Sequence, residues 1–182
     1  MKLTERLGKE WVFFDGGMGT ILQAHGLKAG ELPETWNLSH PDEIIALNRS
    51  YFEAGCDVVN TNTFGANALK YPDNLREIVE AAVSHAKTAR SLAGREEAFV
   101  ALDIGPTGKL LQPMGDLPFE RAVELFSETI RIGAAAGADL VLIETMSDSY
   151  EAKAAVLAAK ESCDLPVVVT TIFDEKGKLL TG

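Results

Sequence analysis

Five short apolar runs, separated by longer segments with helical periodicity, constrain the fold of this chain more than any other feature. The runs fall at residues 11–15, 57–61, 99–104, 140–145 and 166–172. Several are continuous in Val, Ile and Leu instead of alternating with polar residues, which is typical of parallel strands covered on both faces. The alternation of strand and helix patterns predicts an α/β protein built on a parallel sheet.

Helices are expected in the segments between these runs. From residue 75 onward, apolar side chains recur at i, i+3, i+4 and i+7, and the pattern ends at Gly94, as is typical of a helix C-terminus. One sequence pattern occurs twice, at residues 54–59 (AGCDVV) and at residues 136–141 (AGADLV). In each copy it combines an expected helix end, a glycine and a strand start. This repeat supports successive β/α units. Further helices are expected from a capping box at residues 39–42, from about residue 118, and over residues 149–162.

Two architectures fit such units, an open doubly wound sheet and a closed barrel. The open sheet needs a phosphate-binding glycine turn, but the turn at residues 15–20 (DGGMGT) lacks the G-x-G-x-x-G spacing and begins with an acid. Polar residues gather where the predicted strands end, which is typical of a (β/α)8 TIM-type barrel. These residues are Asp15, residues 60–63, Asp103, Glu144, Thr170 and Thr171. We therefore expect residues 1–182 to form a single barrel domain, truncated at its C-terminal side, with about the first five β/α units.

Charge and cysteine content restrict the partners. The net charge of −10 at pH 7 repels phosphate backbones and anionic lipids, so neither nucleic acid nor a membrane is expected as a partner. Residues 1–6 lack the apolar core of a secretory signal. Cys56 and Cys163 have no metal-type spacing and are typical of buried cysteines in a reducing cytoplasm, the expected location.

Asp15 and Glu144 are the strongest candidates for chemistry. Each directly follows an apolar run and should therefore lie at the mouth of a strand, partly desolvated. Two carboxylates across a barrel mouth can hold an ammonium group, bind a metal or transfer a proton. The alternative for each is that it caps the helix that follows.

The glycine turn after Asp15 is a second candidate. Gly16, Gly17 and Gly19 allow backbone N–H groups to approach a ligand closely, and with Thr20 they could hold a carboxylate at a helix start. A plain tight turn explains the same residues equally well. Residues 60–63 and 103–108 fit the walls of a site or ordinary turn chemistry. The three histidines, at positions 25, 40 and 85, have no partner spacing and are expected to be non-catalytic.

Four motifs in this order resemble one known family. They are DGGMGT at 15–20, TNTFGAN at 61–67, DIGPTGKL at 103–110 and IETMSD at 143–148. Together they resemble the homocysteine S-methyltransferase family, and within it the homocysteine-binding module of cobalamin-dependent methionine synthases. The segments at 31–44 and 170–182 are also similar, so the resemblance covers essentially the whole chain.

The resemblance implies a (β/α)8 barrel that methylates the thiol of homocysteine to give methionine. It implies that Asp15 and Glu144 hold the α-amino group of homocysteine. It further implies that backbone amides around Gly19 and Thr20 receive the carboxylate, and that Asn62 belongs to the wall of the same pocket.

The resemblance also implies zinc and a second module. In the family, three cysteines bind a zinc ion that deprotonates the homocysteine thiol, and methylcobalamin on another domain donates the methyl group. One cysteine ends a later strand and two lie in a Gly-Gly-Cys-Cys-Gly-Thr motif, so all three are expected beyond Gly182. Cys56 and Cys163 do not match them. We therefore assign no metal ligand and no catalytic residue here, and expect the isolated chain to be inactive.

Two alternatives remain open. The methyl donor could be betaine or S-methylmethionine instead of methylcobalamin. With methylcobalamin as the donor, the expected partners are homocysteine and the folate- and cobalamin-binding modules of the same or another chain. In a different class, the chain could be a non-catalytic fragment that binds amino acids. Five strands of a barrel would also leave two exposed sheet edges, so the isolated chain is expected to be oligomeric, poorly soluble or only partly folded.

Overall fold

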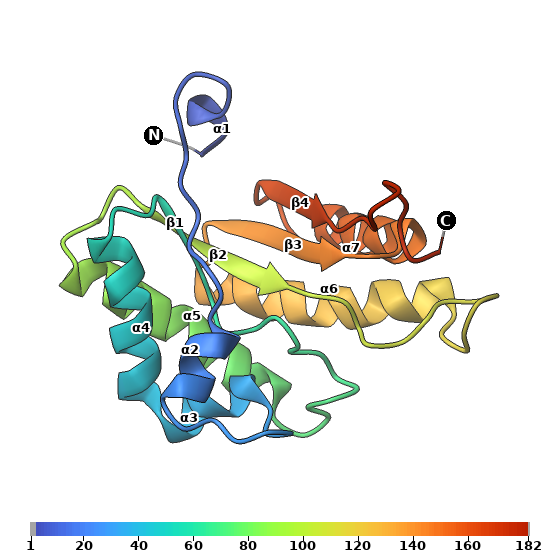
Figure 1. The fold of residues 1–182 in the computed structure, drawn as a ribbon, viewed down its shortest axis with the longest axis horizontal. Coiled ribbons are helices and arrows are strands. Elements are labelled where there is room, and N and C mark those ends of the chain that lie inside the picture. Colours follow the sequence, from blue (N-terminus) through green and yellow to red (C-terminus); the bar gives the residue numbers. More distant parts are fainter. Residues whose placement is uncertain (1–2, 182) are drawn as a thin grey trace.

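One parallel sheet organises the computed structural model, which describes residues 3–181. Its strands pair in chain order, so each lies beside the strands that precede and follow it in the sequence. A helix lies between successive strands (Figure 1). This confirms the predicted α/β class and four of the predicted strand positions. The strands are β1 (Val58–Asn60), β2 (Phe99–Ile104), β3 (Leu140–Met146) and β4 (Val167–Thr171).

Four long helices lie side by side in chain order along one face of the sheet (Figure 1). They are α4 (Pro41–Glu53), α5 (Leu75–Leu92), α6 (Phe119–Ala136) and α7 (Ser149–Ser162). Leu102 and Ile104 of β2 and Val141 and Ile143 of β3 pack against α5, α6 and α7 in the largest apolar core. The N-terminal region contributes α1 (Leu3–Arg6), α2 (Gly19–Ala24), the 3-10 helix η1 (Pro33–Thr35) and α3 (Trp36–Ser39).

The opposite, inner face of the sheet carries a second apolar cluster, which contains Val58, Ala101 and Leu142. Successive side chains of a strand point to opposite faces, so residues two positions further on share this inner face. Asn60 and Asp103 follow Val58 and Ala101 by two residues. The polar residues at the carboxyl ends of these strands therefore belong to the inner face, away from the helices.

The strand expected at residues 11–15 is the main correction to the predicted fold. Only one isolated parallel bridge forms there, between Phe14 and Val58. Asp15 donates its backbone N–H to the carbonyl of Val58 at 3.1 Å. The N–H of Phe13 bonds the side chain of Asp57 at 2.9 Å. The prediction that residues 11–15 lie parallel to β1 is confirmed, but the prediction that they form an extended strand is wrong.

The repeated AG-x-D segment has the same structure at both positions. Gly55 and Gly137 end α4 and α6 with φ of 103° and 94°, a region that glycine adopts without steric cost. Asp139 accepts the N–H of Val100 in the preceding strand at 2.8 Å, just as Asp57 bonds the segment before β1. Both aspartates also pair with an arginine. In each copy of the repeat, the aspartate therefore bonds its β/α unit to the segment that precedes it.

Helix capping differs from the expectation at α4. The predicted capping box does not form, because Ser39 ends α3 and its hydroxyl donates to the carbonyl of Thr35 at 3.2 Å. Helix α4 begins at Pro41 with no side-chain cap. Helix α7, in contrast, is capped by Asp148, which accepts the N–H of Tyr150 at 2.8 Å.

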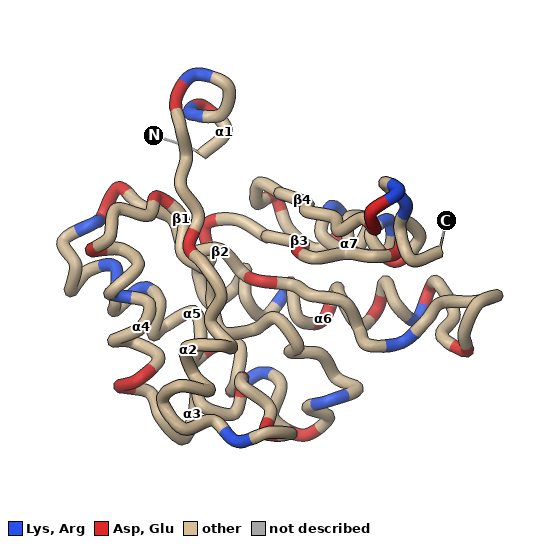
Figure 2. The backbone as a smooth tube through the Cα atoms, viewed as in Figure 1, with Lys and Arg blue, Asp and Glu red and all other residues tan. Residues whose placement is uncertain are grey.

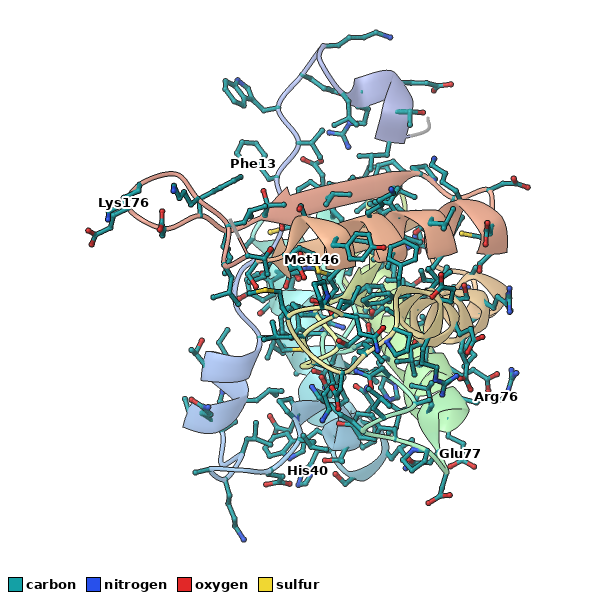
Figure 3. All side chains as sticks on the ribbon, turned by 90° about the vertical axis from the view of Figure 1, so that its right-hand side faces the viewer. Phe13, His40, Arg76, Glu77, Met146 and Lys176 are labelled. Atoms are coloured by element: carbon teal, nitrogen blue, oxygen red, sulfur yellow. The ribbon has the colours of Figure 1, made fainter. Side chains whose placement is uncertain are left out.

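Apolar side chains are exposed along both outer edges of the sheet. Met146, at the end of β3, lies in the interior, whereas Phe13 lies on the peripheral segment before β1 (Figure 3). Lys and Arg are distributed over many elements and interspersed with Asp and Glu (Figure 2). No helix within residues 3–181 is both long and apolar enough to cross a bilayer. The exposed apolar residues at the edges are Trp11, Phe13, Val169, Ile172 and Phe173.

Candidate functional site

A pocket of about 530 Å³ lies at the carboxyl ends of the strands. Its walls come from the glycine turn before α2, the segment around η1, and the loops that follow β1, β2 and β3. Asp15, Asn60, Asp103 and Glu144 bring polar groups to it from successive strand ends. The other lining residues are Gly16, Gly17, Met18, Gly19, Leu32, Pro33, Glu34, Thr61, Asn62, Phe64, Gly65, Lys70 and Thr145.

Asp15 is held by the end of the neighbouring strand. Its Oδ2 accepts the backbone N–H of Asn60 at 2.8 Å, whereas its Oδ1 is buried without a protein partner in the described part of the chain. Burial raises the pKa of Asp15 to about 7, and the charge of Glu144 adds to this effect while the N–H of Asn60 opposes it. Asp15 caps no helix, since α2 follows Met18 without a side-chain cap. A carboxyl group with one free oxygen is therefore available to a ligand.

Glu144 occupies an irregular part of β3. The pairing of β3 with β4 shifts between Ile143 and Met146. Next to Glu144, Thr145 has φ of 61°, the one positive value at a non-glycine residue within residues 3–181. For a β-branched residue this conformation costs about 1–3 kcal/mol and is often found at functional sites. Burial raises the pKa of Glu144, which is half-buried and lines the pocket. Helix α7 uses Asp148 as its cap, so Glu144 is not needed there.

Asp103 is a third carboxyl group, which the sequence analysis placed at a strand end and in a possible site wall without giving it a binding role. It is only 5% exposed and lines the pocket. Burial raises its pKa well above the ordinary range, and the charges of Glu144 and Asp15 raise it further. The signal that singled out Asp15 and Glu144, an acid directly after an apolar run, also applies to Asp103 and could have found it.

Asn62 lines the pocket and fixes one of its walls. Its side-chain amide donates to the carbonyl of Pro33 at 2.9 Å and to Oδ1 of Asn37 at 3.1 Å. These bonds attach the segment around η1 to the end of β1. The placement agrees with a wall position, and a direct role toward a ligand stays a prediction.

Glu34 is a pocket residue that the sequence analysis missed. It is 3% exposed, and its carboxylate accepts the N–H of Gly65 and, at 2.6 Å, the hydroxyl of Tyr71. Nothing in the local sequence distinguishes Glu34 from a solvent-exposed loop acid, because its partners are 31 and 37 residues away.

The glycine turn lies against the same pocket. Gly16, Gly17 and Gly19 line it, and the hydroxyl of Tyr51 donates to the carbonyl of Gly17 at 3.2 Å. Thr20 is exposed and is not among the lining residues, so the structure brings together four of the five predicted site residues. None of the three histidines lines the pocket.

The sequence analysis assigns no zinc ligand to this chain, because the resemblance places the three cysteines beyond Gly182. Within residues 3–181, no group of three or more His, Cys, Asp or Glu side chains is arranged to hold a metal ion. Cys56 lies before β1, where its thiol donates to the carbonyl of Phe14. Cys163 lies at the end of α7, where its thiol donates to the carbonyl of Ala159. Neither thiol is in the pocket.

Comparison with known proteins identifies related sequences. The sequence profile of the homocysteine S-methyltransferase family matches residues 12–182. The methionine synthase of Mycobacterium tuberculosis is 29% identical over 99% of this chain, and that of Mycobacterium leprae is 30% identical over 99%. The chain spans only 16% of the length of each of these proteins.

Two solved structures share the fold. The homocysteine methyltransferase MmuM from Escherichia coli in its metallated form has a TM-score of 0.83 at 20% identity. Its oxidised form has a TM-score of 0.78 at 21% identity. In both comparisons 97% of this chain matches 68% of the other. This similarity confirms the predicted arrangement as part of the barrel fold of these enzymes. With the family profile matched over residues 12–182, the chain belongs to the homocysteine S-methyltransferase family.

Proposed function

We propose that this chain binds homocysteine and presents its thiol for methylation to methionine. The observation that carries the proposal is that Asp15, from the segment before α2, and Glu144, from β3, line one pocket in a chain of this family. Asp15 retains a buried oxygen without a partner among residues 3–181, as a site for an ammonium group requires. An ionised acceptor makes a stronger hydrogen bond than a neutral one, so two carboxylates suit the amino group of an amino acid.

The pocket accommodates the other groups of homocysteine as well. The backbone amides around Gly19 and Thr20 would receive the carboxylate, since the glycine turn allows close approach of N–H groups. Leu32 and Phe64 give another part of the pocket wall an apolar character, which suits the methylene groups and the thiol. Asn62 holds this wall through its bonds to the segment around η1.

Activation of the thiol is not assigned to the described residues. A free thiol with a pKa of about 8.5 is mostly protonated at neutral pH, and a zinc ion bound in the intact family domain would supply the thiolate. The role proposed for the described residues is to bind and orient the amino acid.

The methyl donor in this proposal is methylcobalamin carried by another module, with folate- and cobalamin-binding modules as partners. The 29% and 30% identity to two methionine synthases supports this donor. Betaine and S-methylmethionine are the competing donors. A protein that carries this chain within the complete family domain tests the choice when it is incubated with homocysteine, zinc and each donor in turn and methionine is measured by mass spectrometry. Methionine formation from betaine alone would reject the cobalamin assignment.

Calorimetric titration tests the binding step directly. We expect homocysteine to bind, and 4-mercaptobutyrate, which lacks the amino group, to bind far more weakly. 3-Mercaptopropylamine, which lacks the carboxylate, should retain the contribution of the two acids. Equal affinity for homocysteine and 4-mercaptobutyrate would show that Asp15 and Glu144 do not recognise the amino group.

A further inference from the structure

Asp103 differs from the other buried aspartates in what surrounds its carboxyl group. Asp57 and Asp148, the other buried aspartates within residues 3–181, each accept a backbone N–H through the side chain. The side chain of Asp103 receives no hydrogen bond from residues 3–181, and its Oδ1 is buried without a partner. A buried carboxylate without donors is strongly disfavoured, because nothing replaces the water that it loses.

Two threonine side chains hold the backbone of Asp103 beside the pocket. Its N–H donates to Oγ1 of Thr61 at 3.2 Å, and its carbonyl accepts the hydroxyl of Thr63 at 2.7 Å. The two threonine hydroxyls also bond each other at 2.7 Å. The TNTF motif therefore holds Asp103 on the inner face, where it lines the pocket between Asp15 and Glu144.

The ionisable groups whose charges act on Asp103 are all acids. Glu144 has the largest effect, followed by Asp15 and Glu34. Lys70 is the only basic residue among those that line the pocket, and it is exposed on the side of Gly65, next to Glu34. Like charges at short range disfavour simultaneous ionisation, so one carboxyl group of this cluster keeps its proton.

We infer that Asp103 is a positioning residue that stays protonated, donates its O–H to the carboxylate of Glu144, and thereby orients Glu144 and Asp15 toward the amino group of the substrate. The inference rests on the proposed binding of homocysteine. In this arrangement Asp15 and Glu144 carry the negative charges that bind the ammonium group. Asp103 is the neutral hydrogen-bond donor.

An amide can replace a protonated acid as a donor, whereas a methyl group cannot. Asp103→Asn should therefore recover most of the homocysteine affinity that Asp103→Ala loses. A hydrogen bond to a charged group contributes about 1.5–3 kcal/mol, so Asp103→Ala should weaken binding roughly tenfold to hundredfold. Asp103→Asn should bind within about threefold of the unmodified protein, a change near 0.7 kcal/mol.

The experiment is a titration with homocysteine at pH 8 of the unmodified protein, Asp103→Asn, Asp103→Ala and the control Asp164→Asn. Asp164 is exposed in the turn before β4, at the rim opposite the pocket. If Asp103→Asn binds as weakly as Asp103→Ala, the residue acts through a negative charge and the inference is wrong. If Asp103→Ala binds as tightly as the control, the residue positions nothing and the inference is equally wrong.

A second measurement does not depend on homocysteine. Carbon-13 NMR of the protein with labelled aspartate carboxyl groups should show one protonated aspartate at pH 8, absent in Asp103→Asn. Full ionisation of every aspartate would overturn the inference whatever the protein binds. A protonated Asp103 in a protein that binds no homocysteine would reject the proposed function, and the positioning role with it.

Discussion

Asp15 accepts the backbone N–H of Asn60 at 2.8 Å through one carboxyl oxygen, while its other oxygen is buried without a partner among residues 3–181. The bond joins the segment before β1 to the end of β1 itself. It fixes the direction of the Asp15 side chain before any ligand arrives. The unpartnered oxygen then needs a donor, and the ammonium group of an amino acid supplies one.

Asp15→Asn and Glu144→Gln should each weaken homocysteine binding about tenfold to hundredfold, because each removes a charge-assisted hydrogen bond worth roughly 1.5–3 kcal/mol. Isothermal titration at pH 8 measures the change, with Asp164→Asn as the control for an acid-to-amide substitution away from the pocket. Unaltered affinity in both variants would remove the two acids from the binding site.

The affinity for homocysteine should rise with pH across neutrality. Burial raises the pKa of Asp15 to about 7 in the empty pocket, and the ammonium group binds the ionised form. Binding therefore releases a proton below pH 7, and the affinity should fall by up to about tenfold for each pH unit below that value. Titrations between pH 5.5 and 8 in buffers of different ionisation enthalpy measure both the affinity and the released proton. The slope should flatten in Asp15→Asn, and a wild-type affinity independent of pH would contradict the prediction.

Asp15 should also limit the stability of the protein. Its pKa is raised from 3.8 to about 7, so the favourable contribution of its protonated form is complete below pH 3.8 and is lost as the pH rises through 7. Asp15→Asn should therefore unfold at a higher temperature than the wild type at pH 8, by the equivalent of a few kcal/mol at most, since one pKa unit corresponds to about 1.4 kcal/mol. The difference should be smaller at pH 5. Differential scanning calorimetry at pH 8 and pH 5 measures the two melting temperatures. A variant that is less stable than the wild type at pH 8 would mean that Asp15 stabilises the fold.

The helices and four of the strands could be predicted because they depend on local periodicity. Apolar runs of Val, Ile and Leu and helical stripes of side chains are visible in any short window of sequence. The segment at residues 11–15 has the composition of a strand, but it pairs with β1 through one isolated bridge, between Phe14 and Val58. The extent of pairing depends on contacts with residues more than 40 positions away, which local composition does not encode.

Asp57→Ala should loosen the segment that carries Asp15. It removes the acceptor of the Phe13 N–H, a hydrogen bond worth about 0.5–1.5 kcal/mol, and it removes the ion pair with Arg6. Hydrogen exchange at the N–H of Asp15 should accelerate, and homocysteine binding should weaken as a consequence. Glu10→Gln is the matched control, because it breaks only the more exposed pair with Arg6. Equal exchange rates in wild type and Asp57→Ala would show that the segment is held by other contacts.

The exposed edges of the sheet should cause the 182-residue protein to self-associate. Val169 in β4 is 41% exposed, and Phe173, just after β4, is 59% exposed. Phe13, at the other edge of the sheet, is 60% exposed. Exposed apolar residues beside unpaired strand edges favour association with another chain. Light scattering should detect oligomers, which Phe173→Lys should reduce. Leu92→Lys, which changes an exposed leucine at the end of α5, should not. A monodisperse wild-type monomer would contradict the prediction.

The pocket was only partly visible in the sequence. Asp15 and Glu144 follow apolar runs, and this rule leads equally to Asp103. Thr20 follows the same glycine turn as Gly19, yet it is exposed and does not line the pocket. Glu34 enters the wall through contacts with Gly65 and Tyr71 that exist only after the chain has folded. Residues at strand ends can thus be read from sequence, whereas those supplied by long loops cannot.

The repeated AG-x-D segment bears on the route by which the chain acquires its structure. Each of the two aspartates bonds a segment that precedes it in the sequence, and β2, β3 and β4 each pair with the strand before them. A unit emerging from the ribosome therefore finds its docking partner already synthesised. This order of contacts keeps sequence separations short and permits growth of the sheet by successive addition during translation. Asp57 and Asp139 would each form this hydrogen bond when their own unit is synthesised, and the bond would then hold that unit against the preceding segment.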